Sequence, residues 1–386
     1  FSFDRDRVVS IRDSITRRLD RHQLEPIAVS RMSNDRADSD RIRVKLLMKR
    51  PLIDQRLWRR QLPDAEPSIG RCDFLFDAAA RDYDWLVVYD ELPPAGERLA
   101  CPRSNTLLVT AEPSSIKVYG QAYLRQFGAV LTSQEPWALQ HPGVIRRMPA
   151  LRWFYGWPHQ AGSPILTRDL IARRSIEKDR LISATCSEKR MGHTFHRARY
   201  DFVMALKQAI PEMDVFGRGI RPMNDKAEAL DRYRYHVAIE NHLAPHHITE
   251  KLTDAYLGGA MPLYFGAPNA GDYYPRDSFV AIDIRNIDRS IEAVRRAIAS
   301  DVYENGREAL DRAKRLVLER DNLFAVLAEQ IDRLDTGDRG DRGDRLISRR
   351  GLRRRNPLIG AASLVERWRV RARLRRANQA ASESHA

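Results

Sequence analysis

Residues 235–266 read YHVAIENHLAPHHITEKLTDAYLGGAMPLYFG, and this stretch decides the fold. The apolar residues of 235–240 predict a strand, and a polar loop follows it. Residues 250–257 then form a predicted helix that stops at a Gly-Gly pair, and residues 261–265 form a second predicted strand. Strand, helix and strand in this order indicate a βαβ unit and therefore a parallel sheet.

The same alternation continues on both sides of this stretch. In the second half of the chain, we expect strands at 181–185, 213–216 and 279–283, and helices at 197–210, 287–299 and 302–334. In the first half, we expect strands at 26–30, 43–48, 85–90, 106–110 and 129–132. Nearly continuous apolar runs such as 85–89 are typical of strands buried on both faces.

These patterns predict an α/β fold of two Rossmann-like domains with a cleft between them, followed by a basic tail. We place the first domain at residues 1–160 and the second at 161–334. The segment 149–164 joins the domains, and its aromatic residues either line the cleft or pack in the core. In open parallel sheets, ligands bind beyond the carboxyl ends of the strands, so the loop after 235–240 is the first place to look for chemistry.

Charge is concentrated at the end of the chain. Twelve Arg and one Glu lie between residues 345 and 378, so this segment carries +11 of the formal net charge of +14. A Gly-Asp-Arg repeat precedes it, and such low-complexity sequence predicts a linker, so we assign 335–386 as linker and Arg-rich tail. A basic tail suggests a surface partner, whereas the nearly neutral body would hold the chemistry.

Composition narrows the class of protein. With 43% hydrophobic and 31% charged residues, and no apolar run near the roughly 20 residues of a membrane span, we expect a soluble chain. Three cysteines without CxxC spacing argue against a disulfide framework and favour a reducing compartment. The histidines at 193, 196, 242, 246 and 247 form no regular ligand pattern with cysteine, so we expect no metal site.

The loop 240–249 and the helix that follows it carry groups suited to a phosphate-bearing ligand. A helix N-terminus offers free N–H groups and a partial positive charge to a diphosphate. Lys251 in the first turn is unexpected on dipole grounds unless an anion binds there, and the alternative is that it points to solvent. Glu240, Asn241 and Glu250 can hydrogen-bond to ribose or sugar hydroxyls, although Glu250 would also suit a helix N-terminus on its own.

An ordered set of motifs resembles the donor-binding region of glycosyltransferase family 10, the α-1,3/1,4-fucosyltransferases. The set spans about residues 181–286 and includes Ile-Glu-Asn at 239–241, Ile-Thr-Glu-Lys at 248–251, Ala-Tyr at 255–256, Met-Pro-Leu-Tyr-Phe-Gly at 261–266 and Asp-Ser-Phe-Val at 277–280. The resemblance implies a GT-B fold, inversion at the sugar carbon and GDP-fucose as the donor. It makes 1–160 the acceptor-side domain and 161–334 the domain that binds the nucleotide sugar.

The resemblance also assigns roles to individual residues. Arg199 and Lys251 would contact the diphosphate, whereas Arg199 taken alone would be a solvated helix arginine. Glu250 would hold ribose or sugar hydroxyls, Asn241 would line the donor pocket, and the turn 214–217 would pass near the nucleotide. Family members commonly carry a tyrosine where this chain has His247, whose shorter side chain can be charged near neutral pH, and this departure concerns the choice of sugar.

The loop after 106–110 resembles the family segment that carries the catalytic carboxylate, which makes Glu112 the candidate general base. Its alternative role is a plain turn residue before Pro113. The scheme requires no cofactor or metal, although a divalent cation could stimulate activity. A metal-dependent GT-A enzyme would carry a DxD motif. The acidic pairs at 38–40 and 82–84 do not lie at a strand end in the half predicted to bind the donor, so this class of enzyme is less favoured.

Several alternatives stay open. The donor could be another nucleotide sugar, and the acceptor could be a lipopolysaccharide, a capsule or a protein-linked glycan. The Arg-rich tail could bind nucleic acid through phosphates, but the body shows no nucleic-acid module. Arginines that alternate with Trp368 and other apolar residues better suit an anionic membrane surface. Because this alternation is not cleanly helical, a disordered, solvated tail is the alternative. We therefore expect a cytoplasmic protein, peripheral on the inner membrane.

Overall fold

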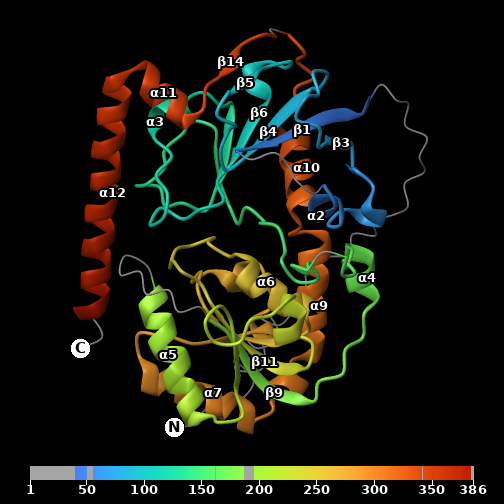
Figure 1. Ribbon diagram of the computed structural model, residues 1–386, viewed down its shortest axis with the longest axis vertical. Helices are drawn as coiled ribbons and strands as arrows, with labels where there is room; N and C mark the ends of the chain where they lie inside the picture. The colour runs from blue at the N-terminus through green and yellow to red at the C-terminus, as the bar shows by residue number, and fades with distance from the viewer. Residues whose placement is uncertain (1–39, 50–54, 161, 187–194, 341, 384–386) are drawn as a thin grey trace, which may run out of the picture. The chain divides into compact units, whose positions relative to one another are not determined.

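The computed structural model describes residues 40–49, 55–160, 162–186, 195–340 and 342–383. Arg41–Ala386 form one compact unit, in which the chain builds two α/β lobes on separate sheets (Figure 1). We call them the N-lobe and the C-lobe. The strand expected at 26–30 lies outside the described residues.

The N-lobe is built on seven strands in the order β2-β3-β1-β4-β6-β7-β8, parallel except where β2 meets β3. The strands are β1 (Ile42–Met48), β2 (Ser68–Ile69), β3 (Cys72–Leu75), β4 (Trp85–Tyr89), β6 (Thr106–Val109), β7 (Ala129–Thr132) and β8 (Val144–Arg146). The four residues 85–88 of β4 have no exposed surface, because both faces of the sheet are covered. The short helices of this lobe are α2 (Arg56–Arg59) and α3 (Gln121–Leu124).

The C-lobe is built on five parallel strands in the order β10-β9-β11-β12-β13. They are β9 (Arg180–Thr185), β10 (Asp214–Phe216), β11 (Tyr233–Ile239), β12 (Met261–Phe265) and β13 (Val280–Ala281). The helices α4 (Arg168–Arg173), α5 (His196–Ala209), α6 (Glu250–Leu257) and α7 (Ile287–Ala299) belong to the same half of the chain. The predicted fold class of two α/β domains, each on a largely parallel sheet, is confirmed.

One predicted helix is divided. The stretch 302–334 forms α8 (Val302–Asn305), α9 (Arg307–Glu319) and α10 (Leu323–Leu334). Gly306 separates the first two helices, and the side chain of Asn322 caps α10 by accepting a hydrogen bond from the Phe324 amide. Helix α9 packs on α6 of the C-lobe, whereas Phe324 of α10 packs against Phe74 of the N-lobe with ring centroids 4.9 Å apart. The pair α9–α10 therefore crosses from one lobe to the other (Figure 1).

The segment expected to be a linker is tied to the N-lobe. Asp335 accepts a hydrogen bond from the indole of Trp85 at 2.9 Å, and Arg339 lies 3.0 Å from Asp84. Strand β14 (Arg345–Leu346) pairs with β5 (Glu97–Arg98), and Leu346 is fully buried. The repeat has few apolar residues of its own, but its charged groups find partners on the edge of the lobe. The sequence could not foresee this because those partners lie some 250 residues away.

The chain ends in two helices, α11 (Arg349–Arg355) and α12 (Pro357–Glu383). The carboxylate of Glu366 accepts from the amide of Gln121, Val370 is buried, and Arg373 lies over the ring of Trp137. Helix α12 therefore lies against the N-lobe (Figure 1). None of the helices that the structure describes combines the length and the apolar composition needed to cross a bilayer.

Candidate functional site

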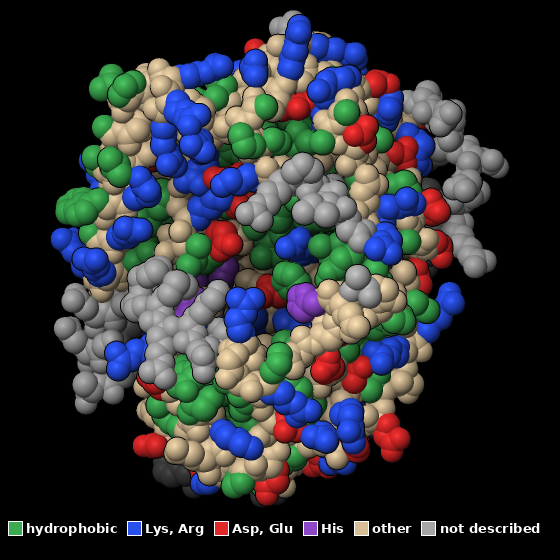
Figure 2. All heavy atoms as spheres, viewed as in Figure 1, with side chains coloured by type: hydrophobic (Ala, Val, Ile, Leu, Met, Phe, Trp, Pro, Cys, Tyr) green, Lys and Arg blue, Asp and Glu red, His purple; other side chains and the backbone are tan. Residues whose placement is uncertain are grey.

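A pocket of about 460 Å³ brings together residues of both lobes. The N-lobe side contributes Glu112, after the carboxyl end of β6, and Asp90, after that of β4; the C-lobe side contributes Asn241 and the start of α6. Figure 2 shows the surface hollowed near its centre, where acidic, basic and histidine side chains meet. The pocket lies where parallel strands end, as sequence reasoning expected.

The start of α6 is held by a buried carboxylate. Glu240 follows β11 and has no exposed surface. Its Oε1 accepts a hydrogen bond from the amide of Thr249 at 2.8 Å. The hydroxyl of Thr249 donates to both carboxylate oxygens, at 2.9 Å to Oε1 and at 2.7 Å to Oε2. Thr249 in turn caps α6, because its hydroxyl accepts from the amide of Lys251. Burial, followed by the charge of Glu250, raises the pKa of Glu240 against the opposing effect of Lys251.

This placement corrects the role predicted for Glu240. Its carboxylate is buried and bound to Thr249, so it positions the helix and is not part of the pocket lining. The same packing explains the glycine that ends the motif at 261–266. A Cβ on Gly266 would lie 2.6 Å from Cγ of Glu240 and 2.1 Å from the hydroxyl of Tyr264.

Lys251 is a pocket cation with two carboxylate partners. Its Nζ lies 3.1 Å from Oε1 of Glu250 and 3.5 Å from Oε2 of Glu240, and its side chain is 21% exposed. Burial alone would lower the pKa of Lys251, but Glu250 and Glu240 outweigh burial and raise it. Burial would likewise raise the pKa of Glu250, but Lys251 and Lys226 bring it to about 2. Both groups are therefore charged at neutral pH and line the pocket.

Arg199 lies beside Asn241. The guanidinium donates from Nη1 to Oδ1 of Asn241 at 3.0 Å, its Nε has no hydrogen-bond partner among the residues with described positions, and the residue is only 8% exposed. The positive charge of Arg199 acts to lower the pKa of Lys251, because the two cations are close. The structure therefore excludes a solvated Arg199. Asn241 lines the pocket, and Arg199 stands behind it, outside the pocket lining that the structure describes.

The turn 214–217 brings β10 close to the end of β9. Gly217 has φ of 142°, and a Cβ there would lie 1.7 Å from the carbonyl oxygen of Cys186. Asp214 is engaged away from the pocket, in ion pairs with Arg180 and Arg221. The turn is thus fixed by backbone contact, and its acidic residue has structural partners.

Glu112 meets the pocket with a free carboxylate. Its backbone is held, since its carbonyl accepts from Nε2 of Gln134 at 2.8 Å and its amide points to the hydroxyl of Tyr119 at 3.5 Å. The side chain is exposed and has no hydrogen bond or ion pair with any residue that the structure describes. The cleft walls still desolvate the carboxyl, which raises its pKa; Asp90 adds to the effect, and Lys117 and Lys251 oppose it. A carboxylate of this kind can accept a proton.

His247 lines the pocket as a neutral ring. Its Nδ1 lies 3.3 Å from the hydroxyl of Ser133, and its ring packs edge-on against His242 with centroids 5.5 Å apart. Burial lowers the pKa of His247 to about 3, and the neighbouring His242 and Lys251 add to the effect. The expectation that this histidine can be charged near neutral pH is therefore wrong, because the ring is buried and lies near Lys251.

Sequence reasoning missed part of the N-lobe wall. Asp90, with φ of 69°, accepts from Lys117 at 2.6 Å, and its place at the end of a predicted strand was a usable signal. Trp58 and Arg152 also line the pocket, and no local pattern pointed to them. Of the aromatic residues in 149–164, Phe154 lines the pocket whereas Trp153 is fully buried, so both expected roles occur.

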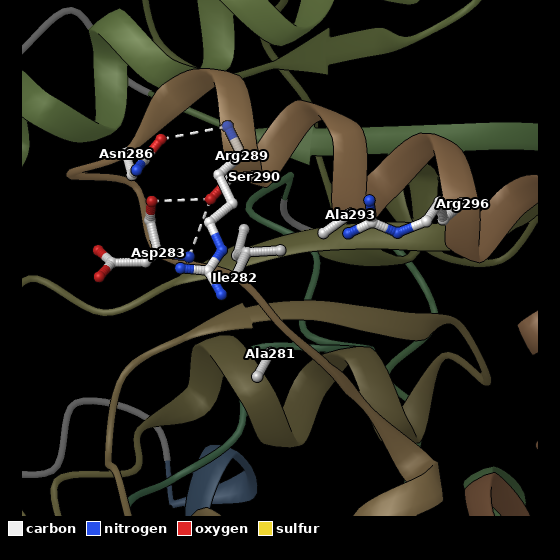
Figure 3. A pocket seen from close by; sticks show the side chains of 8 residues that line it. All are labelled: Ala281, Ile282, Asp283, Asn286, Arg289, Ser290, Ala293 and Arg296. Carbon is white, nitrogen blue, oxygen red and sulfur yellow. Dashed lines mark hydrogen bonds between the residues drawn. The ribbon is translucent and has the colours of Figure 1, made fainter.

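A second cavity, of about 600 Å³, lies along α7 and contains none of the predicted site residues (Figure 3). Its polar groups serve the helix start: the hydroxyl of Ser290 donates to the carbonyl of Asp283 at 2.7 Å, and Asn286 caps α7. Among the residues with described positions, no group of three His, Cys, Asp or Glu is placed to hold a metal ion.

Residues 176–295 match the family model "Glycosyltransferase family 10 (fucosyltransferase) C-term". An alpha-(1,3)-fucosyltransferase of Helicobacter pylori is 33% identical over 97 residues, which cover 23% of this chain and 20% of the relative. A human 4-galactosyl-N-acetylglucosaminide 3-alpha-L-fucosyltransferase is 37% identical over 92 residues, 22% of this chain and 25% of that protein. The chain thus spans a fifth to a quarter of the length of these curated relatives.

A solved structure of an alpha1,3-fucosyltransferase with GDP-fucose covers 79% of this chain and 93% of its own, with a TM-score of 0.44 at 14% identity. The family match coincides with the strands and helices that build the C-lobe side of the pocket. The resemblance drawn from the sequence is confirmed for residues 176–295, which match the C-terminal domain of glycosyltransferase family 10.

Proposed function

We propose that this chain is an inverting glycosyltransferase that transfers fucose from GDP-fucose to a hydroxyl of a glycan acceptor. The observation that carries the proposal is one pocket that joins a free carboxylate, Glu112, to the cationic start of α6 in a family 10 domain. The names of the relatives support fucose as the sugar. The acceptor belongs to a surface polysaccharide, a lipopolysaccharide or a glycoprotein.

The mechanism is a single displacement. Glu112 removes the proton from the acceptor hydroxyl as its oxygen attacks the anomeric carbon of fucose, and the bond to the diphosphate breaks on the opposite face. Negative charge then grows on the departing GDP. Lys251 and the amide groups at the start of α6 face that charge, while Arg199 supports Asn241 from behind.

The ion pair with Glu250 limits how much positive charge Lys251 alone can offer to a bound diphosphate. Because Lys251 already has two carboxylate partners, a bound diphosphate shares this cation with Glu250 and gains from the helix N-terminus as well. Glu250 also lines the pocket, where a carboxylate can accept hydrogen bonds from ribose or sugar hydroxyls. The scheme needs no metal, although a divalent cation beside the diphosphate could stimulate transfer.

A donor panel tests the proposal. GDP-fucose, GDP-mannose, UDP-glucose and UDP-N-acetylglucosamine are compared for thermal stabilisation of the protein and for release of the nucleoside diphosphate. We expect GDP-fucose to give the largest effect in both assays, and NMR of the first product to show β-to-α inversion. Preference for a UDP-sugar would support another donor on the same fold, and no response to any nucleotide sugar would contradict the function.

We further propose that α12 docks the protein on an anionic membrane surface at the cytoplasmic face. Its exposed apolar residues fall on one helical stripe, with 77% of Leu358, 60% of Leu364, 47% of Val365 and 70% of Trp368 open to solvent. Arginines flank the stripe, and the buried Val370 lies on the other side. Such a helix suits the boundary between anionic headgroups and acyl chains.

Vesicle flotation tests this docking. The full chain should float with phosphatidylglycerol vesicles and not with phosphatidylcholine vesicles, and Trp368→Ser with Leu364→Ser should remove most of the binding. A truncation after residue 356 is preferable to one before Leu346, because Leu346 is buried in the N-lobe. Unchanged flotation of the double variant would contradict the role of α12, and a DNA shift assay would test binding of nucleic acid instead.

A further inference from the structure

The cations that line the pocket differ in their partners. Lys49 lies 3.0 Å from Glu91, and Lys251 lies 3.1 Å from Glu250. Arg152, the third cation of the pocket lining, has no carboxylate within ion-pair distance among the residues that the structure describes. Among the described residues, Arg152 is therefore a cation of the pocket lining without an ion-pair partner, as Glu112 is a carboxylate without one.

Arg152 is nevertheless held in place. Its guanidinium carbon lies 5.5 Å from the ring centre of Trp58 and 5.2 Å from that of Phe154. Trp58 is buried and packs edge-on against Tyr89, with centroids 5.2 Å apart, so this wall is rigid. Each aromatic ring stabilises the cation, and the N–H groups of the guanidinium donate no hydrogen bond to a described residue, which leaves them for an anion.

The position of Arg152 indicates which ligand it meets. It belongs to the segment between the lobes, and its ring partner Trp58 lies in α2 of the N-lobe, whose loops also supply Glu112. The residues proposed for the donor, Asn241, Glu250 and Lys251, come from the C-lobe. Aromatic rings beside the base suit the apolar face of an acceptor sugar.

We propose that Arg152 selects acceptor glycans that carry an acidic group, a sugar carboxylate or phosphate, next to the hydroxyl that receives fucose. The inference rests on the proposed function and narrows its acceptor to a chemical class. The guanidinium fork donates two parallel hydrogen bonds to the anion, a geometry that a neutral sugar cannot provide. Arg152 thus determines specificity, while Glu112 performs the proton transfer.

Matched acceptors test the proposal. Three synthetic oligosaccharides differ only in the sugar next to the acceptor residue: glucuronic acid, glucose 6-phosphate or glucose. The wild-type protein should use the acidic acceptors with kcat/KM about 10 to 100 times that of the neutral one, the range expected for a charge-assisted pair. Arg152→Gln should reduce this ratio to about one, and Arg152→Lys, which keeps the charge without the fork, should retain part of it.

The control is Lys49→Gln, which removes a pocket cation that already has a carboxylate partner and should leave the acidic-to-neutral ratio as in the wild type. The affinity for GDP is measured for every variant, and Arg152→Gln should bind GDP as the wild type does. An equal ratio in wild type and Arg152→Gln would overturn the proposal. So would a large loss of GDP affinity in Arg152→Gln, because the guanidinium would then serve the donor.

Failure of the proposed function gives a different result. If the wild-type protein binds no nucleotide sugar, the glycosyltransferase assignment fails. The role of Arg152 is then tested by binding alone, through NMR titration of the protein with glucuronate, glucose 6-phosphate and glucose. Anion binding that Arg152→Gln abolishes would support the acidic site, and equal shifts with all three sugars would overturn it.

Discussion

Glu112 is the side chain on which the proposed chemistry depends most directly. Glu112→Gln keeps the shape of the residue and removes its basicity, so kcat should fall by roughly 100- to 10,000-fold while GDP-fucose binding is retained. The exposed Glu177→Gln serves as the matched control. Steady-state kinetics and calorimetry separate the two effects, and normal turnover of Glu112→Gln would assign the base to another residue.

The raised pKa of Glu112 sets the pH profile. The carboxyl must be ionised to accept a proton, so activity should fall as the pH drops through this pKa, which lies above the ordinary value of a glutamate.

His247 should make the folded protein sensitive to acid. Its pKa is about 3 in the fold and about 6.5 when unfolded, so the unfolded chain takes up the proton first as the pH falls. Its contribution to stability is full above pH 6.5 and is lost progressively between pH 6.5 and 3, which amounts to about 2 kcal/mol between pH 7 and 5.

The measurement is chemical unfolding at pH 7 and pH 5. His247→Gln should lose less stability on acidification than the wild type by about that amount. The exposed His159→Gln should behave as the wild type does. Equal acid sensitivity of wild type and His247→Gln would show that the ring accepts a proton without cost.

At the scale of elements, the tail helix α11 supports the loop that carries Glu112. The Arg349 guanidinium donates to Glu91 at 2.5 Å and to the carbonyls of Tyr119 and Val118, and its side chain is 14% exposed. Glu91 also pairs with Lys117. Burial alone would raise the pKa of Glu91, but the cations around it outweigh burial and bring the pKa to about 2. The contacts continue from Tyr119, whose hydroxyl meets both Asp90 and the amide of Glu112.

We expect Arg349→Ala to lower both stability and kcat. The unfolding free energy should drop by about 1–3 kcal/mol, because Glu91 keeps its lysines while buried carbonyls lose their donor. The KM for GDP-fucose should stay unchanged, since the start of α6 is untouched. Its neighbour Arg350 is exposed, so Arg350→Ala is the matched control. Identical behaviour of the two variants in thermal unfolding and kinetics would refute the coupling.

The contrast between predicted and observed elements has a physical cause. The strands and helices around 235–266 were predictable because their apolar periodicity, caps and terminal glycines are local features. The division at Gly306 was missed because the pattern of 302–334 stays helical on both sides of it. The anchoring of residues 335–346 depends on Trp85 and β5, which are distant in sequence, so no local pattern reports it.

In the site, too, local sequence patterns identified some residues and could not report contacts that form only in the fold. Residue type and place in the chain identified Asn241, Glu250 and Lys251, which do line the pocket. They could not tell that Glu240 faces inward, since a strand end offers both directions to a side chain. Arg152 was missed because its partner Trp58 comes from another element and the pair forms only in the fold.

For the whole molecule, the account rests on two lobes that share one pocket, with the donor phosphates on the C-lobe side. Calorimetric titration with GDP tests this most directly, using Lys251→Gln and, as control, Lys49→Gln from the opposite wall. We predict that the wild type and Lys49→Gln bind one GDP with equal affinity, and that Lys251→Gln binds it about 10 to 100 times more weakly while remaining folded by circular dichroism. Absence of GDP binding to the wild type, or equal affinity in Lys251→Gln, would contradict the account.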